Sequence, residues 1–211
     1  MSKRSTSDDT EELDLSDPQH PQNLQENARA YFKNAERFRR SHQERSMRKA
    51  YEQALEYGEA SNTPEGLAIA AECSLYLGHI YKTRDALHQA IEYYERSIEL
   101  ARKSGTSAGF YVGARAAWNL GNTYEESGMN GLEAAFREAI DFGRESKIPE
   151  GLEVAAKAAF NLAANLEPDN VKQVAETWRE AIDLGIESGT SDGKHVAERA
   201  KHYLSELENA K

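Results

Sequence analysis

Apolar residues recur along most of this chain at the three- and four-residue spacing of one helix face. No segment alternates apolar and polar residues over the length of a strand, and no Asn-Gly turn joins two β-branched runs. The pattern therefore predicts an all-α protein. The first clear helical run contains Ala28, Tyr31, Phe32, Ala35 and Phe38.

The helical pattern divides into nine segments, and short connections favour antiparallel pairing of the first eight. Thr63 suits a helix cap, Pro64 suits a first helical position, and Pro168 marks a break. The last segment has no partner and a polar exposed side, which is typical of a cap. The expected helices span residues 23–40, 43–60, 64–82, 85–103, 107–127, 130–145, 149–166, 169–187 and 192–208.

One eight-residue stretch occurs four times, and its copies are 43, 42 and 42 residues apart. A fixed period of this length indicates a repeat array, in which each helical pair buries its apolar face against its neighbours. The copies begin with an aromatic residue, at Tyr51, Tyr94, Phe136 and Trp178. Each copy runs into a similar corner, and the corners begin at Ser61, Ser104, Ser146 and Ser188.

Residues 117–124 read Ala-Trp-Asn-Leu-Gly-Asn-Thr-Tyr and resemble the first helix of a tetratricopeptide repeat. That family places small and aromatic residues at fixed positions along both helices of each pair. The second repeat matches these positions without a gap, at Gly78, Tyr81, Ala90, Tyr94 and Ser97. With one residue fewer between the helices, the later repeats match at Gly121, Tyr124, Phe136 and Ala139, and at Ala163, Leu166, Trp178 and Ala181. The first repeat matches more weakly, at Ala35, Phe38, Met47, Tyr51 and Ala54.

The resemblance implies a right-handed α-solenoid of four helical hairpins with a C-terminal capping helix. Within an array of residues 23–211, the repeats cover about 23–61, 64–104, 107–146 and 149–188, and the cap covers 192–208. The period exceeds the usual value of about 34 and resembles that of kinesin light chain-like repeats. HEAT-type repeats have a similar period, but the recurring Leu-Gly-x-x-Tyr pattern and the absence of proline from helix interiors favour the tetratricopeptide type.

The matched positions have a clear packing role. Small residues such as Gly78 and Gly121 are expected to let the second helix approach closely. Rings such as Tyr94 and Phe136 are expected to fill the space between pairs, each contributing on the order of a few kcal/mol.

Composition and charge limit the class of protein and indicate its cellular compartment. The net charge is −10 and the pI is about 5.2, which disfavours a uniformly basic nucleic-acid binder. No apolar run approaches the roughly 20 residues of a membrane span. The single cysteine, Cys73, favours a reducing, cytoplasmic setting. Residues 1–22 are rich in Ser, Asp and Glu, lack the apolar segment of a signal peptide, and are expected to form a disordered acidic tail.

No catalytic motif is present: the chain has no phosphate-binding glycine loop, no nucleophile elbow and no cysteine pair. His79 and His88 flank a predicted turn, but surface histidines explain them better than a metal site. We therefore expect a protein that is not an enzyme and needs no cofactor or metal.

The resemblance implies a concave groove lined by the first helix of each pair. Asn119 and Asn161 occupy the same position in successive repeats, and amide side chains in such a row can bond to an extended peptide. Leu75, Trp118 and Phe160 would supply an apolar floor, although Trp118 and Phe160 also fit simple packing between long helices. A clamp for a chaperone carboxylate would need a basic residue at these three places. The expected groove residues are Leu75, Tyr76, His79, Arg115, Trp118, Asn119, Asn122, Phe160 and Asn161.

Residues 29–50 form a basic patch in an otherwise acidic chain. Three interpretations stay open: a solvated face, a docking site for an acidic partner, or a nucleic-acid site. The acidic residues of the tail would also be able to shield the patch. Its arginines include Arg37, Arg39, Arg40, Arg45 and Arg48.

These features predict a protein-interaction scaffold or adaptor that binds a protein or peptide partner in its concave groove. The alternative is a self-assembling homo-oligomer, in which the basic first repeat of one copy docks on the acidic C-terminal repeats of another. A nucleic-acid-associated role through the basic patch ranks third, and nucleic acid is an unlikely partner.

Overall fold

A computed structural model describes residues 18–209 of the chain, and every regular element in that range is an α-helix. The helices are α1 (Pro21–Arg40), α2 (Glu44–Ser61), α3 (Pro64–Lys82), α4 (Leu87–Ser104), α5 (Ser107–Ser127), α6 (Leu132–Ser146), α7 (Pro149–Asn165), α8 (Val171–Ser188) and α9 (Ser191–Asn209). Each predicted helix end lies within two residues of the observed one.

The start of α1 corrects one prediction. The disordered tail was expected to extend to residue 22, but Pro21 and Gln22 already belong to the helix. Pro21 fits a first helical turn, and the imidazole of His20 accepts a hydrogen bond from the backbone of Gln22 at 3.3 Å. The acidic residues of the expected tail lie outside the described residues.

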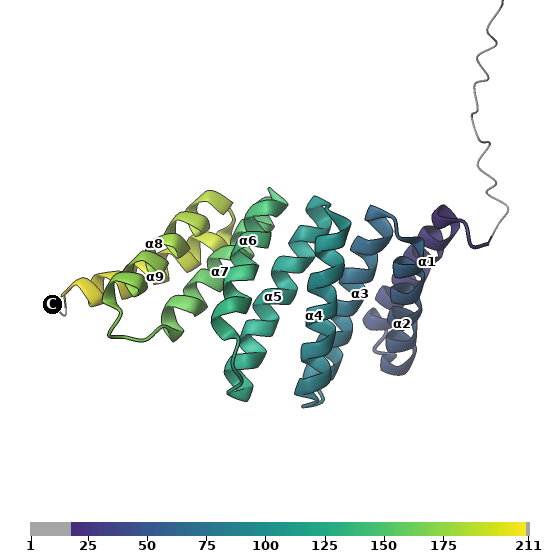
Figure 1. The fold of residues 1–211 in the computed structure, drawn as a ribbon, viewed down its shortest axis with the longest axis horizontal. Helices are drawn as coiled ribbons and strands as arrows, with labels where there is room; N and C mark the ends of the chain where they lie inside the picture. Colours follow the sequence, from purple (N-terminus) through teal and green to yellow (C-terminus); the bar gives the residue numbers. More distant parts are fainter. Residues whose placement is uncertain (1–17, 210–211) are drawn as a thin grey trace, which may run out of the picture.

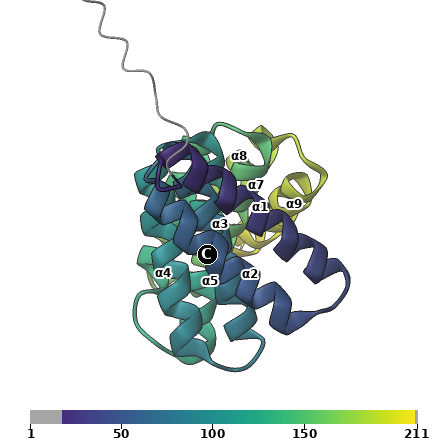
Figure 2. The ribbon, with the colours of Figure 1, turned by 90° about the vertical axis from the view of Figure 1, so that its right-hand side faces the viewer.

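The nine helices form one row in chain order, with α1 and α9 at its opposite ends (Figure 1). Consecutive helices pack against each other within each hairpin and from one hairpin to the next. Seen along the row, the hairpins stack one behind another (Figure 2). The fold is therefore an α-solenoid, as the repeat period predicted.

The two sides of the row differ in how closely their helices approach. The first helices of successive hairpins contact one another directly: α1 with α3, α3 with α5, α5 with α7, and α7 with α9. Successive second helices are joined by long side chains, such as Arg144 of α6 and Glu180 of α8 at 2.9 Å. The closer approach of the first helices makes their side the inner face of the row, and we call it the inner face below.

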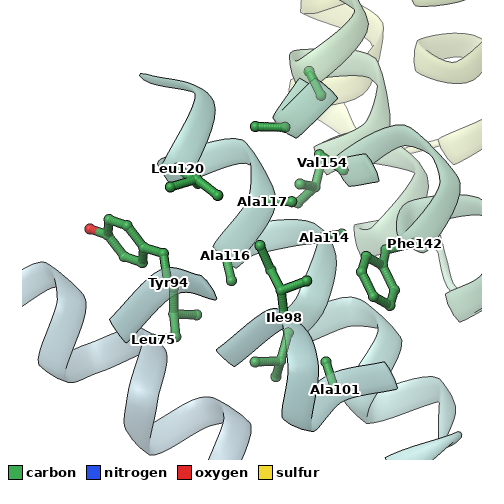
Figure 3. Close-up of a cluster of buried hydrophobic side chains, with 14 of the residues drawn as sticks. Leu75, Tyr94, Ile98, Ala101, Ala114, Ala116, Ala117, Leu120, Phe142 and Val154 are labelled. Atoms are coloured by element: carbon green, nitrogen blue, oxygen red, sulfur yellow. The ribbon is translucent and has the colours of Figure 1, made fainter. Parts of the chain in front are cut away.

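A continuous apolar core runs between the hairpins, and Figure 3 shows part of it from Leu75 to Val154. The repeated rings of Tyr94 and Phe136 are fully buried. A Cβ on Gly78 would lie 2.5 Å from Cε1 of Tyr94, and one on Gly121 would lie 2.5 Å from Cε1 of Phe136. The predicted close approach at these two glycines is therefore confirmed.

The four corners between hairpins share one hydrogen-bond arrangement. The serine that ends each second helix is buried, and its hydroxyl donates to a backbone carbonyl three residues earlier, at 2.7–2.8 Å. In three corners a threonine then caps the next first helix, at Thr63, Thr106 and Thr190. These bonds satisfy polar groups that burial would otherwise leave unpaired, and they fix the angle between hairpins.

Candidate functional site

Tyr76 lies at the centre of the inner face in its N-terminal half. Its ring stacks on Tyr51 with centroids 5.1 Å apart. The guanidinium groups of Arg39 and Arg115 lie over the same ring, 5.0 Å and 5.8 Å from its centroid. Helices α1, α2, α3 and α5 each contribute one of these side chains, so the cluster joins three hairpins.

Two carboxylates accompany these arginines. Glu36 pairs with Arg39 at 2.6 Å and accepts a hydrogen bond from the hydroxyl of Tyr51. Glu72 lies 3.8 Å from Arg115, which is an ion-pair distance beyond hydrogen-bond range. Burial raises the pKa of Glu72, and Glu36 adds to the increase, whereas the positive charges of Arg115 and Arg39 oppose it. Glu72 is thus a half-buried carboxylate, and its charge has no hydrogen-bonded cation among the described residues.

An open hollow of about 480 Å³ lies beside Glu72, at the N-terminal ends of the first helices. Its walls come from α1, α3 and α5 and are mainly apolar, with charged side chains at the rim. The lining residues are Arg29, Phe32, Glu65, Ala68, Ile69, Glu72, Thr106, Ala108 and Val112. Sequence reasoning missed this hollow because its small residues only leave space once three hairpins stack.

His79 lies between the rings of Tyr76 and Tyr94, 6.1 Å and 5.7 Å away. Burial lowers the pKa of His79 to about 4, and the positive charges of Arg115 and Lys82 act in the same direction. The imidazole is therefore neutral at physiological pH. Its Nε2 atom is buried and has no hydrogen-bond partner within residues 18–209.

The asparagines expected to form a ladder are half-buried and already bonded within the protein. The side-chain amide of Asn119 donates to the carbonyl of Arg115 at 2.7 Å. Asn161 of α7 donates to the side-chain oxygen of Asn122 on α5, also at 2.7 Å. The structure thus brings Asn122 and Asn161 together across two repeats, and it turns Asn119 along its own helix.

The expected apolar floor is largely part of the core. Leu75 is fully buried and faces Tyr94 (Figure 3), so it does not reach the groove surface. Trp118 is half-buried, and its indole N–H is buried without a partner in the described part of the chain. Phe160 is 9% exposed and packs edge-on against Trp178 with centroids 4.9 Å apart.

Helix α9 covers Phe160, which the repeat pattern could not show. The guanidinium of Arg199 lies 4.3 Å from the centroid of the Phe160 ring, and Tyr203 packs edge-on at 5.8 Å. Tyr203 also stacks on Trp178 at 5.2 Å. The capping helix therefore takes the place of a further first helix, and it leaves the N-terminal half of the inner face as the more open part.

The arginines of the predicted basic patch lie at the end of α1 and near the start of α2. Arg39 points to the inner face, Arg37 lies over the ring of Phe38, and Arg48 is 3.5 Å from Glu52. Arg40 and Arg45 are exposed. Arg39 and Arg48 have carboxylate partners in Glu36 and Glu52, which reduces the positive field of the patch.

Within residues 18–209, no helix is both long and apolar enough to cross a bilayer. The same residues contain no cluster of three or more His, Cys, Asp or Glu side chains able to hold a metal ion. Cys73 is buried, and burial raises the pKa of its thiol.

The fold and the inner face define a helical-repeat protein. The family model of the tetratricopeptide repeat matches residues 74–104, which span the second half of α3 and all of α4. This match supports the resemblance at the second hairpin, where the sequence pattern fits without a gap. The kinesin light chain-like type stays a prediction. Comparison with curated proteins finds no match.

Among solved structures, the chain is similar to the de novo designed helical repeat protein DHR64, with 23% identity and a TM-score of 0.36. That match covers 90% of this chain and 96% of the other. The DHF119 filament is similar at 22% identity and a TM-score of 0.35, over 89% of this chain and 96% of the other. Similarity at this level does not indicate a shared function or assembly.

Proposed function

We propose that this protein is a non-catalytic interaction scaffold, which binds a peptide or helix of a protein partner along its inner face. One observation carries the proposal: half-buried aromatic, amide and charged side chains from α1, α3, α5 and α7 line that face beside an open apolar hollow. Rings with charged neighbours in such a setting are typical of binding hot spots.

The chemistry of the face suits a peptide backbone as well as side chains. An asparagine side chain has two donors and one acceptor oxygen, so Asn119, Asn122 and Asn161 each keep bonding capacity beyond a single internal bond. Tyr76 and Arg115 add a phenol and a guanidinium, both half-buried, at the centre of the face. A partner lying across α3, α5 and α7 would meet all five side chains.

Site-specific photo-cross-linking tests this proposal. A benzoylphenylalanine would replace Tyr111 on α5, which lies beside Arg115 outside the hollow, or Ala164 on α7, and the protein would be exposed to an extract of its own cells. The matched controls replace Ala60 on α2 or Ala134 on α6, which are exposed on second helices. We expect the same partner to cross-link from positions 111 and 164 but not from the controls. A partner captured only from the second helices would contradict binding on the inner face.

Self-assembly is the second candidate, and the C-terminal end of the row favours it. Ile186 of α8 is 53% exposed and Tyr203 of α9 is 42% exposed, so both leave apolar surface that a second copy would cover. A second copy docking its basic first hairpin on this end would make a head-to-tail contact. Light scattering across a concentration series would detect it, and Ile186→Lys, which places a positive charge opposite the basic hairpin, should abolish the association. A wild-type mass that stays monomeric at all concentrations would contradict this candidate.

A further inference from the structure

The hollow between α1, α3 and α5 has an apolar floor and an acidic rim. Phe32, Ile69 and Val112 contribute from three different helices. The rim holds one cation, Arg29, which pairs with Glu65 at 2.9 Å. Glu65 also accepts a hydrogen bond from the side-chain amide of Gln25 at 2.7 Å. With Glu65 neutralised in this way, Glu72 is left as the rim carboxylate with the weakest pairing.

Glu72 is accessible despite its partial burial. Its side chain is 31% exposed, and its one ion-pair contact in the described residues is Arg115 at 3.8 Å. The guanidinium of Arg115 is itself shared between the rings of Tyr76 and Tyr111, 5.8 Å and 5.5 Å from their centroids. A half-buried carboxylate without a close hydrogen bond gains from an incoming cation that can donate one.

We propose that this hollow receives an apolar side chain of the partner, and that a lysine or arginine of the same partner segment binds the carboxylate of Glu72. The proposal rests on the inner-face scaffold function and adds the chemistry of the partner to it. An acidic segment does not fit here, because the carboxylate of Glu72 would repel it.

The geometry also sets the spacing of the two partner residues. Ile69 and Glu72 lie three residues apart on α3, so their side chains are neighbours about 5–6 Å apart on one helix face. A partner strand places residues i and i+2 on one side at about 6.6 Å, and a partner helix does so for residues i and i+3 or i+4. The basic and apolar residues should therefore occur at one of these spacings.

A random 12-residue peptide library displayed on phage tests the proposal. Selection on the wild-type protein would be paired with counter-selection on Ala68→Phe, in which the added ring fills the hollow. We expect the selected peptides to carry a lysine or arginine two, three or four residues from a large apolar residue. Selected peptides that are acidic, or no enrichment over Ala68→Phe, would overturn the proposal.

A synthetic peptide from the selection would then be measured by fluorescence polarisation. Because the new ion pair is partly solvated, Glu72→Gln should weaken binding by about tenfold. Glu72→Lys should recover affinity for a peptide whose basic residue is changed to glutamate. Unchanged affinity in Glu72→Gln would overturn the role of Glu72.

Matched controls separate a local effect from a general one. Glu99→Gln removes an exposed carboxylate of α4, and Ala134→Phe adds a ring beside a hollow on the outer side. Neither change should alter peptide affinity, and thermal melts would verify that all variants are folded. Cross-linking from Ala164 does not depend on Glu72. A partner found there together with a negative peptide selection would refute this inference and leave the scaffold function standing.

Discussion

Burial changes the chemistry of single residues on the inner face, and His79 shows a consequence between pH 4 and pH 7. A histidine in an unfolded chain has a pKa of about 6.5, whereas burial among Tyr76 and Tyr94, near Arg115 and Lys82, lowers that of His79 to about 4. Between these values the unfolded chain binds a proton that the folded protein does not. The stabilising contribution is therefore complete above pH 6.5 and is lost as the pH falls toward 4.

We predict that replacing His79 by glutamine removes this pH dependence. Relative to His79→Gln, the free energy of unfolding of the wild type should fall by about 2 kcal/mol between pH 7 and pH 5. Urea unfolding at both pH values measures the difference, and carboxylates that titrate in both proteins cancel in the comparison. Parallel changes in the two proteins would show that His79 is not responsible.

Backbone conformation at the corners gives a second residue-level prediction. Lys147 ends α6 in the left-handed region with φ of 56°, where α4 and α8 end in Gly105 and Gly189. A side chain in that conformation costs roughly 1–2 kcal/mol. Glycine avoids this cost, but it loses more backbone entropy on folding, which offsets part of the gain. Lys147→Gly should therefore raise the free energy of unfolding by about 0.5–1 kcal/mol.

Denaturant titration measures the effect of Lys147→Gly. The matched control is Lys201→Gly in the exposed interior of α9, which should lower stability by about 1 kcal/mol because glycine is a poor helix former. A loss of stability in both variants would contradict the strain assigned to Lys147.

The repeat pattern identified the helix on which each candidate residue lies, but it did not identify the contacts that its side chain makes. The repeat pattern placed Asn119 and Asn161 correctly on first helices, yet their hydrogen bonds depend on the rotamer that each side chain adopts. Asn119 bonds within its own helix and Asn161 bonds to a neighbour. Leu75 occupies an equivalent position to Phe160, and both are buried because neighbouring helices close over them.

At the scale of helices, the spacing inside each hairpin depends on one small residue. Gly121→Ala would place a Cβ 2.5 Å from Cε1 of Phe136, which is too close without movement of the ring. Overpacking of this kind costs about 1–3 kcal/mol. We therefore predict a loss of stability of that size, measured by thermal or denaturant unfolding.

A second change tests the cause. Phe136→Leu in the Gly121→Ala background relieves the contact, so the double variant should lose less stability than the sum of the single variants. Additive losses would indicate that the glycine is needed for another reason. The fourth hairpin supplies a natural comparison, because Ala163 occupies the matching position opposite Trp178.

Helix bounds were predictable because the signals are local. Thr63 accepts a bond from the backbone of Gly66 at 3.0 Å and Pro64 begins α3, as their residue types suggest. The cover that α9 provides over Phe160 was not predictable, since Arg199 and Tyr203 lie outside the matched repeats. Their contacts with Phe160 depend on how closely α9 packs against α7 and α8.

At the scale of the whole molecule, stability should vary along the row. Helices α3 to α7 pack between hairpins on both sides, whereas α1 and α9 have neighbours on one side. In a repeat array each hairpin is stabilised mainly by its nearest neighbours, so the ends open first. We predict slower amide hydrogen exchange in α3–α7 than in α1 and α9, measured by mass spectrometry. Uniform protection along the chain would instead indicate one fully cooperative unit.

The four alike corners make this chain a string of exchangeable modules. In each corner a buried serine bonds to the carbonyl three residues earlier, so every second helix ends in the same way before the next hairpin or the capping helix begins. Duplication or loss of a whole hairpin would keep every corner intact. The length of the inner face can therefore change in whole-hairpin steps, without redesign of the parts that remain.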